Sequence, residues 1–313
     1  MVEPPRAASE GGTRCGYVAL VGAPNAGKST LVNQLVGGKV SIVTPKVQTT
    51  RARALGICID GAAQIVLVDT PGIFQPKRRL ERAMVAAAWQ GASDADLVLL
   101  LVDSTRGLDA DTQGILDGLA KAGRRAILAL NKVDLVKRPA LLALADRFRA
   151  IEGAGGAPLI ADVFMISALT GDGVADLRAH LAARLPAGPW LFPEDQISDI
   201  PLRLLAAEVT REKLFLRLHQ ELPYSSTVET ESWQERKDGS VRIEQVIYVR
   251  RDSQKAIVLG KGGRQIKAIG AAARAELAEL FDRPVHLFLF VKVREGWVED
   301  RERYKEMGLD FDS

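Results

Sequence analysis

The sequence has few of the residues on which cross-linked or metal-stabilised proteins depend. Two cysteines and three histidines occur in 313 residues, and their spacing suggests neither a disulfide framework nor a metal site. No apolar run approaches the ~20 residues of a membrane-spanning helix, and the apolar run at 97–102 has only the length of a strand. These shortages argue against a secreted scaffold or an integral membrane protein, and a reducing cytoplasm is the expected compartment.

An excess of charge of one sign is also missing. Lysine and arginine total 42 and the acids 39, so the net charge is +3, which is too small by itself to indicate a nucleic-acid partner. Apolar residues make up 47% of the chain and charged residues 26%, as is typical of folded proteins. At roughly 150 residues per domain, this length predicts about two domains. Residues 1–14 lack the apolar segment of a secretory signal, and we expect them to be a flexible tail.

From residue 15 to residue 185, short apolar runs alternate with segments of helical period. The expected strands are 17–21, 65–68, 97–102, 126–130 and 163–166. The expected helices are 28–35, 80–90, 112–120, 140–148 and 174–185. This alternation predicts an α/β domain with a mostly parallel sheet and helices on both of its faces. Ligands of such sheets bind beyond the carboxyl ends of the strands.

A proline-rich stretch at 186–201 interrupts this pattern, and we expect it to be a linker. Beyond it, the pattern predicts a helix at 202–221, strands at 227–233 and 241–249, a helix at 254–259, a long helix ending near Phe281, and a strand at 285–293. Residues 202–313 are therefore expected to form a second, smaller α+β domain.

A glycine-rich loop follows the first expected strand. The sequence Gly-Ala-Pro-Asn-Ala-Gly-Lys-Ser at 22–29 matches G-x-x-x-x-G-K-[ST] and opens the first expected helix, which is the context that a phosphate-binding loop requires. Backbone N–H groups and the helix N-terminus attract phosphates, Lys28 neutralises the β and γ oxygens, and Ser29 offers a hydroxyl to Mg²⁺. The simpler interpretation is a glycine turn beside a helix cap.

Three further motifs follow expected strands. Asp-Thr-Pro-Gly at 69–72 places a carboxylate near Mg²⁺ and a backbone N–H near the γ-phosphate. Asn-Lys-Val-Asp at 131–134 supplies a carboxylate that accepts both N–H groups of the guanine edge, a pairing that adenine lacks. Ser-Ala-Leu at 167–169 offers the Ala168 N–H to guanine O6. The order and the strand-end positions of the motifs predict a site for GTP and GDP.

The predicted nucleotide-binding residues come from all four motifs: Asn25, Ala26, Gly27, Lys28, Ser29, Thr30, Asp69, Gly72, Asn131, Lys132, Asp134, Ser167, Ala168 and Leu169. The motifs look like those of the translation-factor class of small GTPases, which keep a Mg²⁺-binding threonine between the first two. By register with related bacterial GTPases we favour Thr50 over Thr49 as the threonine that joins Ser29 and Asp69 at Mg²⁺. Lys28, Thr50 and Gly72 are the expected catalytic residues.

The residue after the second motif departs from the Ras pattern. Ile73 stands where Ras-like proteins carry the glutamine that orients the attacking water, so we expect slow intrinsic GTP hydrolysis and acceleration by a partner or a cation. Asn25 is suggestive because similar GTPases that use K⁺ carry an asparagine there. The alternative interpretation is that Asn25 only favours the turn.

A second glycine-rich loop, Gly-Lys-Gly-Gly at 260–263, lies between two expected helices, as in the RNA-binding KH domains that clamp a nucleotide backbone. The pattern alone is weak, since 153–156 also matches it. Seven basic residues and one acid lie at 250–274, although such a run is often a solvated helix face. The expected RNA-binding residues are Gly260, Lys261, Gly262, Gly263, Arg264 and Lys267.

The loop at 22–30, Gln-Thr-Thr-Arg at 48–51, Phe-Pro-Glu-Asp at 192–195, Glu-Leu-Pro-Tyr at 221–224 and Pro-Val-His at 284–286, together with the loop at Gly260, closely resemble the Era GTPases of bacteria. The resemblance begins near residue 14 and runs to the last residue. It implies a P-loop GTPase domain at 15–185 and a KH-type domain at 202–313, in a protein that assists maturation of the small (30S) ribosomal subunit by binding near the 3′ end of 16S rRNA.

The resemblance further implies a cytoplasmic protein with a peripheral inner-membrane fraction. It also implies switch segments that reposition the second domain when the γ-phosphate is present. We expect a monomer that uses GTP or GDP with Mg²⁺, and K⁺ if Asn25 has the role described above.

Two other functions fit the same residues. The chain could act in tRNA modification or another RNA-processing pathway, with a second domain that contacts protein. It could instead be an RNA-binding protein whose first domain only binds nucleotide, although intact Lys28, Ser29, Asp69 and Asn131 favour turnover. A phosphotransferase acting on metabolites is disfavoured, because the motif at 131–134 reads guanine and no acceptor site is evident.

Overall fold

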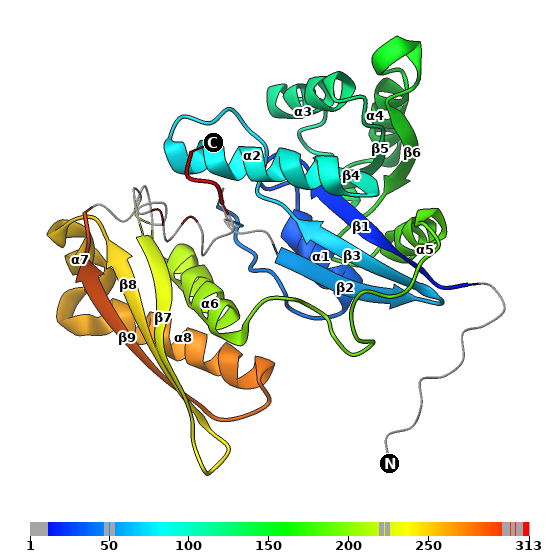
Figure 1. The fold of residues 1–313 in the computed structure, drawn as a ribbon. Helices are drawn as coiled ribbons and strands as arrows, with labels where there is room; N and C mark the ends of the chain where they lie inside the picture. Colours follow the sequence, from blue (N-terminus) through cyan, green and yellow to red (C-terminus); the bar gives the residue numbers. More distant parts are fainter. Residues whose placement is uncertain are drawn as a thin grey trace, which may run out of the picture. The chain divides into compact units, whose positions relative to one another are not determined.

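The chain forms two compact units, seen here in a computed structural model that describes residues 12–46, 50, 54–218, 222, 226–295, 301, 304 and 309–312. The first unit takes the described parts of 1–40, 50–199 and 312–313, and the second takes those of 41–49 and 200–311. The division between 199 and 200 falls inside the expected linker. Figure 1 shows the elements of both units.

The first unit is built on a six-stranded sheet. Its strands are β1 (Arg14–Val21), β2 (Ala54–Asp60), β3 (Ala63–Asp69), β4 (Leu97–Asp103), β5 (Ala126–Asn131) and β6 (Ile160–Met165). They lie in the order β2-β3-β1-β4-β5-β6, and β2 alone of these six runs antiparallel to its neighbour. The predicted mostly parallel sheet is confirmed.

Five helices cover the two faces of this sheet (Figure 1): α1 (Lys28–Val36), α2 (Arg79–Asp94), α3 (Ala110–Lys121), α4 (Arg138–Arg149) and α5 (Val174–Arg184). Apolar residues of α1 and α5 pack with those of the strands in one core cluster. Those of α2, α3 and α4 pack in a second cluster on the opposite face. Since each parallel strand is buried on both faces, β3 and β5 are buried along their whole length.

Strand β2 was not predicted from the sequence. Gly56 and, to a lesser degree, Ala54 weaken its β-propensity, and no motif follows it. The strand forms because the chain turns at 61–62 and β2 pairs along its full length with β3. Because this pairing depends on β3, the hydrophobic pattern of residues 54–60 alone does not reveal the strand.

The stretch expected to be a linker packs along the first unit. We call residues 186–199 the strap. The Ile57 N–H donates to Ile197 O at 2.9 Å, and the buried side chain of Gln64 accepts from the N–H groups of Leu191 and Phe192 at 2.8 and 3.0 Å. The strap therefore satisfies backbone groups of β2, which would otherwise be an open edge of the sheet.

The second unit is a three-stranded sheet with helices on one face. The elements follow in the order α6 (Leu202–Arg217), β7 (Ser226–Glu235), β8 (Val241–Val249), α7 (Asp252–Leu259), α8 (Arg264–Leu280) and β9 (Val285–Val293). Strand β8 is central, antiparallel to β7 and parallel to β9. Buried residues of the helices and of β8 form two core clusters. The predicted α+β domain is confirmed.

Helix α6 ends earlier than predicted. The prediction placed its end near residue 221, but the last helical residue is Arg217, and Leu218 is extended. The Lys46 ammonium donates to the carbonyls of Phe215 and Leu218, and the Val43 N–H donates to Glu212 Oε1 at 2.8 Å. Segment 41–46 thus supplies a cation to the carboxyl end of α6, where the helix dipole favours one.

Among the described residues, no helix is both long enough and apolar enough to cross a membrane.

Core packing on α4 allows a matched test of this fold. Leu144 is buried in the second core cluster, whereas Leu142, on the same helix, is 59% exposed. We expect Leu144→Ala to lower the free energy of unfolding by about 2–4 kcal/mol, because it removes buried methyl groups and leaves a cavity. Leu142→Ala should change it by less than about 0.5 kcal/mol. Urea unfolding measures both, and equal losses would contradict the assigned packing.

Candidate functional site

The four predicted motifs lie at the carboxyl ends of neighbouring strands. The phosphate-binding loop follows β1, Asp69 ends β3, Asn131 ends β5, and Ser167 follows β6 soon after its last residue. Because β3, β1, β4, β5 and β6 are adjacent and parallel, these ends meet at one edge of the sheet. The structure therefore brings the motifs of the first unit together.

The loop after β1 depends on unusual backbone geometry. Asn25 is exposed with φ at 64°, and Gly27 caps α1 with φ at 101°. A Cβ on Gly27 would lie 2.3 Å from Asn131 Nδ2, so glycine is needed both for the conformation and for the close approach. Asparagine tolerates positive φ better than most residues, which supports the turn interpretation of Asn25.

Lys28 lies at the first position of α1 and is buried. Its ammonium donates to Gly22 O at 3.0 Å and to Ala23 O at 3.1 Å. Burial lowers the pKa of Lys28 to about 8, and the Asp69 carboxylate opposes this shift. The loop therefore encloses an ammonium group whose pKa lies only slightly above neutral pH. Ala26, in the loop before α1, is buried, and Thr30, in the first turn of α1, is half-buried.

Three oxygen-bearing side chains converge beside the loop. Ser29 Oγ lies 2.9 Å from Thr50 Oγ1 and donates to Asp69 Oδ2 at 2.9 Å, and Thr50 Oγ1 donates to the same carboxylate oxygen at 3.2 Å. Asp69 is fully buried. Two hydroxyls and a carboxylate suit a hard cation such as Mg²⁺. Thr50 thus lies where a Mg²⁺ ligand is expected, while Thr49 is outside the described residues.

The segment after Asp69 is held against the loop by its backbone. The Ile73 N–H donates to Gly22 O at 3.1 Å, and Gly72 packs closely on Pro24. The Ile73 side chain is 5% exposed and lies in the second core cluster. It therefore points into the core, and its position offers no polar group to a water molecule.

The carboxamide of Asn131 joins two loops. Its Nδ2 donates to Ala26 O at 2.8 Å, and its Oδ1 accepts the Ala168 N–H at 2.9 Å. This N–H, which the sequence analysis offered to guanine O6, holds the side chain of Asn131 in this structure. Asn131 is 2% exposed, so breaking either bond would leave a buried polar group unpaired.

Lys132 depends on a residue that the sequence analysis missed. Its ammonium lies 2.6 Å from Asp103 Oδ2, and Asp103 ends β4 beside Asn131. Burial tends to raise the pKa of Asp103, but hydrogen bonds from Lys132 and Thr105 outweigh it, and the pKa lies below its usual value. The signal was available, because Asp103 directly follows an expected strand, as Asp69 does.

The remaining predicted base contacts differ in exposure. The Asp134 carboxylate is exposed and has no hydrogen-bond partner among the described residues, as befits an acceptor for a base. Ser167 is buried and its Oγ accepts the Thr170 N–H at 3.2 Å. Leu169 is 78% exposed. Ser167 thus shapes its loop, and Asp134 and Leu169 face solvent.

The second predicted site lies in the second unit, between α7 and α8. Gly260, Gly262 and Gly263 have φ values of 68°, 62° and 73°, which side chains rarely adopt. Space around Gly262 and Gly263 is open, with no atom within 4 Å of a Cβ built there. The loop is therefore a bare stretch of backbone that another backbone can approach.

Three cations surround this loop. Lys261, Arg264 and Lys267 are all exposed. Within the described part of the chain, their side chains make one hydrogen bond, from Arg264 Nε to Lys261 O at 3.3 Å. A carbonyl does not neutralise a guanidinium, so the loop carries net positive charge. Exposed backbone with adjacent cations is suited to phosphate groups.

Two family models match the chain. A 50S ribosome-binding GTPase model matches residues 17–132, and a KH domain model matches residues 221–298. The first covers the loop after β1, the motif at 69–72 and the start of the motif at 131–134, and the second covers the loop at 260–263.

Similarity to individual proteins extends over nearly the whole chain. GTPase Era of Rhizobium meliloti is 65% identical over 299 residues, covering 96% of this chain and 94% of the relative. GTPase Era of a Bradyrhizobium species (strain ORS 278) is 62% identical, covering 97% of each. Era of Aquifex aeolicus, solved with GDP and AlF4⁻, superposes with a TM-score of 0.88 at 39% identity, covering 95% of this chain and 99% of that one.

A second solved structure, of Era with MgGDPNP and nucleotides 1506–1542 of 16S ribosomal RNA, gives the same TM-score of 0.88 at 39% identity and covers 95% of this chain and 99% of that chain.

The pKa of Lys28 leads to a test of its role. A lysine binds phosphate in its protonated form, and burial lowers this pKa to about 8. We expect the affinity for a non-hydrolysable GTP analogue to fall above pH 8, by about tenfold per pH unit, because the free protein must first take up a proton. Fluorescence titration with a labelled analogue measures this.

The control is Lys28→Arg, whose guanidinium stays protonated throughout this range. Its affinity should be weaker but nearly constant between pH 7 and pH 9, values chosen as about one unit on either side of the Lys28 pKa. A fall of equal slope in both proteins would assign the pH dependence to another group.

Proposed function

The chain belongs to the Era family of GTPases, and from this premise we propose that it assists assembly of the small ribosomal subunit by binding near the 3′ end of 16S rRNA. It is a GTPase with a KH domain and uses GTP, GDP and Mg²⁺. The observation that carries the proposal is the bare, cationic loop at 260–263, in one chain with the nucleotide site.

A complex of a relative supports this choice of RNA. Era with 39% identity to this chain was solved with nucleotides 1506–1542 of 16S ribosomal RNA. The GTPase family whose model matches residues 17–132 is described as 50S ribosome-binding, but this match covers only part of the first unit. The near-full-length similarity to Era includes the KH domain as well, and we therefore favour the RNA of the small subunit.

We assign the roles at the nucleotide site from its geometry. Lys28 binds the β and γ phosphates, and Ser29, Thr50 and Asp69 hold Mg²⁺. When bound, Mg²⁺ neutralises charge on the phosphate oxygens. The backbone N–H of Gly72 approaches the γ-phosphate, so loss of that phosphate would release Gly72 and Thr50 together.

Hydrolysis is expected to be slow without a partner. The buried Ile73 side chain has no group that can orient a water molecule, so this task falls to backbone groups and to an external activator. A K⁺ ion beside Asn25 remains a prediction.

We place the protein in the cytoplasm, and we propose that a fraction associates peripherally with the inner membrane. The location where the small subunit is assembled supports the first part. The second part follows from the family resemblance alone.

Base selectivity gives one test. The exposed Asp134 carboxylate is assigned to the two N–H donors of guanine. We expect Asp134→Asn to lower the affinity for GDP by about 100-fold or more, because the amide replaces one acceptor with a donor. Xanthine nucleotides, which carry an oxygen at the altered position, should gain affinity.

Isothermal titration with GDP and with XDP measures both effects. Asp172→Asn removes an exposed carboxylate from the loop that follows Ser167 and should change neither affinity. Unchanged GDP binding by Asp134→Asn would contradict the assignment.

RNA binding gives the decisive test of the proposed function. We expect the chain, loaded with a GTP analogue, to bind the 3′-terminal segment of 16S rRNA and to lose at least about tenfold in affinity on Gly262→Asp. The substitution forces a side chain into a position of positive φ and adds a negative charge where phosphates bind. Filter binding measures the affinity.

The hairpin between β7 and β8 supplies a matched control. Gly239 also has positive φ, at 80°, and open space around it, so Gly239→Asp carries the same strain and charge away from the loop. It should bind RNA as the unaltered chain does. Equal affinity of both variants would overturn the KH loop as the RNA site.

A further inference from the structure

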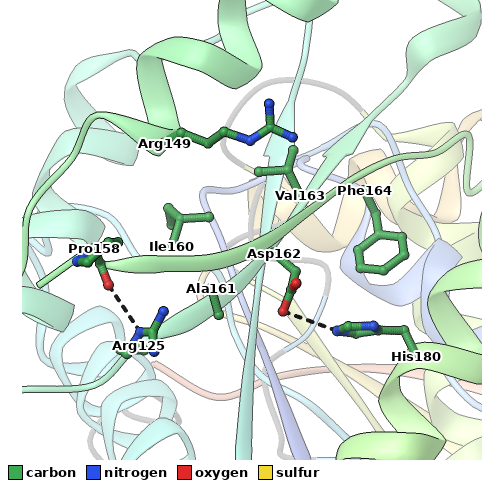
Figure 2. Close-up of a pocket in the computed structure, with 9 residues that line it drawn as sticks. All are labelled: Arg125, Arg149, Pro158, Ile160, Ala161, Asp162, Val163, Phe164 and His180. Atoms are coloured by element: carbon green, nitrogen blue, oxygen red, sulfur yellow. Dashed lines mark hydrogen bonds and ion pairs between the residues drawn. The ribbon is translucent and has the colours of Figure 1, made fainter.

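A hollow lies along the outer edge of β6, the last strand of the six-stranded sheet. Its volume is about 480 Å³, and residues 160–164 form its base. Figure 2 shows Arg149 on one side, Phe164 and His180 on the other, and Arg125 near the start of β6. A smaller hollow of about 280 Å³ adjoins it and shares Arg125 and Ala161.

The edge beside the hollow has free backbone groups. Along a parallel strand, successive residues direct their backbone N–H and C=O alternately toward one side of the strand and toward the other. The Ile166 N–H donates to Leu130 O. The backbone N–H and C=O of Phe164, two residues earlier, therefore also point toward β5, whereas those of Val163 and Met165 point away from it. The described part of the chain provides no partner on that side, whereas the strap covers the opposite edge at β2.

Positive charge gathers around both hollows. They are lined by four arginines, Arg124, Arg125, Arg149 and Arg184, and by two carboxylates, Asp96 and Asp162. Asp162 is paired with Arg184 at 2.8 Å. Among the described residues, Arg125 donates only to a carbonyl, Pro158 O at 3.1 Å, and no carboxylate there compensates its charge.

Arg149 is another weakly compensated cation. It lies 3.4 Å from Asp146, and the two side chains are 61% and 75% exposed, so the pair holds the guanidinium only loosely. The planar guanidinium groups of Arg125 and Arg149 thus line the same hollow. A guanidinium group can donate two parallel hydrogen bonds to the oxygens of a phosphate.

An aromatic pair completes the lining. The rings of Phe164 and His180 lie with centroids 4.9 Å apart, and both residues are half-buried in the wall of the hollow. Single-stranded nucleic acid is bound by this combination of cations for the phosphates and aromatic rings for the bases.

We propose that this hollow is a second RNA site, which takes one unpaired nucleotide of the rRNA. Arg125 and Arg149 bind its phosphate groups, its base packs on Phe164, and the outward N–H of Val163 is a further donor. The site rests on the proposed function, because it presumes an RNA partner, and it adds a contact on the GTPase unit to the KH loop.

The test measures the affinity of the full chain, loaded with a GTP analogue, for full-length 16S rRNA at several salt concentrations. Each phosphate contact with single-stranded RNA contributes about 0.7 to the slope of log affinity against log salt. We expect Arg125→Ala and Arg149→Ala each to lower the slope by about that amount and to weaken binding several-fold at low salt.

The matched control is Arg147→Ala. Arg147 is exposed on the same helix as Arg149 but does not line the hollow, so its removal deletes the same charge and should leave the slope unchanged. Phe164→Leu keeps an apolar side chain and should weaken binding about fivefold or more at every salt concentration, because stacking is not screened. Thermal unfolding of each variant checks that the fold is kept.

The outcomes separate this inference from the proposed function. If Arg125→Ala and Arg149→Ala match Arg147→Ala while Gly262→Asp still weakens binding, the second site is overturned and the proposed function stands. If the unaltered chain binds no rRNA, both fail. A slope that is lowered in Arg125→Ala and Arg149→Ala but unchanged in Arg147→Ala supports the second site.

Discussion

One buried carboxamide organises the nucleotide site. Asn131 bonds Ala26 O in the phosphate-binding loop and the Ala168 N–H in the loop after β6, and so fixes two loops that leave different strands. This arrangement also restricts Gly27, because a Cβ there would meet Asn131 Nδ2 at 2.3 Å. The same residue that tethers the loops therefore requires the glycine that gives the phosphate-binding loop its turn.

The two ends of the parallel strands in the first unit carry different kinds of residues. Carboxyl ends of the strands hold the buried lysine and the three oxygens suited to Mg²⁺, whereas the amino ends of β4, β5 and β6 carry arginines around open hollows. In the second unit Lys46 donates to carbonyls at the end of α6, and in the first unit Thr50 contacts Ser29. The strap closes one edge of the sheet and leaves the other for a partner.

Much of the fold followed from local patterns. The five expected strands of the first unit are present, as are the helices between them, because each carries its own periodic signal. The motifs could be placed at strand ends for the same reason. Strand β2, the early end of α6 and the packing of the strap were not foreseen, since each depends on partners elsewhere in the chain: β3, Lys46 and Gln64. Asp103 was missed although its signal resembled that of Asp69.

The sequence by itself determined the residue types of both loops, the order of the motifs and the two-unit organisation, because glycine conformation, hydrophobic period and motif spacing act over short distances. Only the tertiary structure decided that Thr50 meets Ser29 and Asp69, that Ala168 donates to Asn131, and that the edge of β6 stays open beside two weakly paired arginines. These are relations between residues distant in sequence, and they exist only once strand order and register bring those residues together.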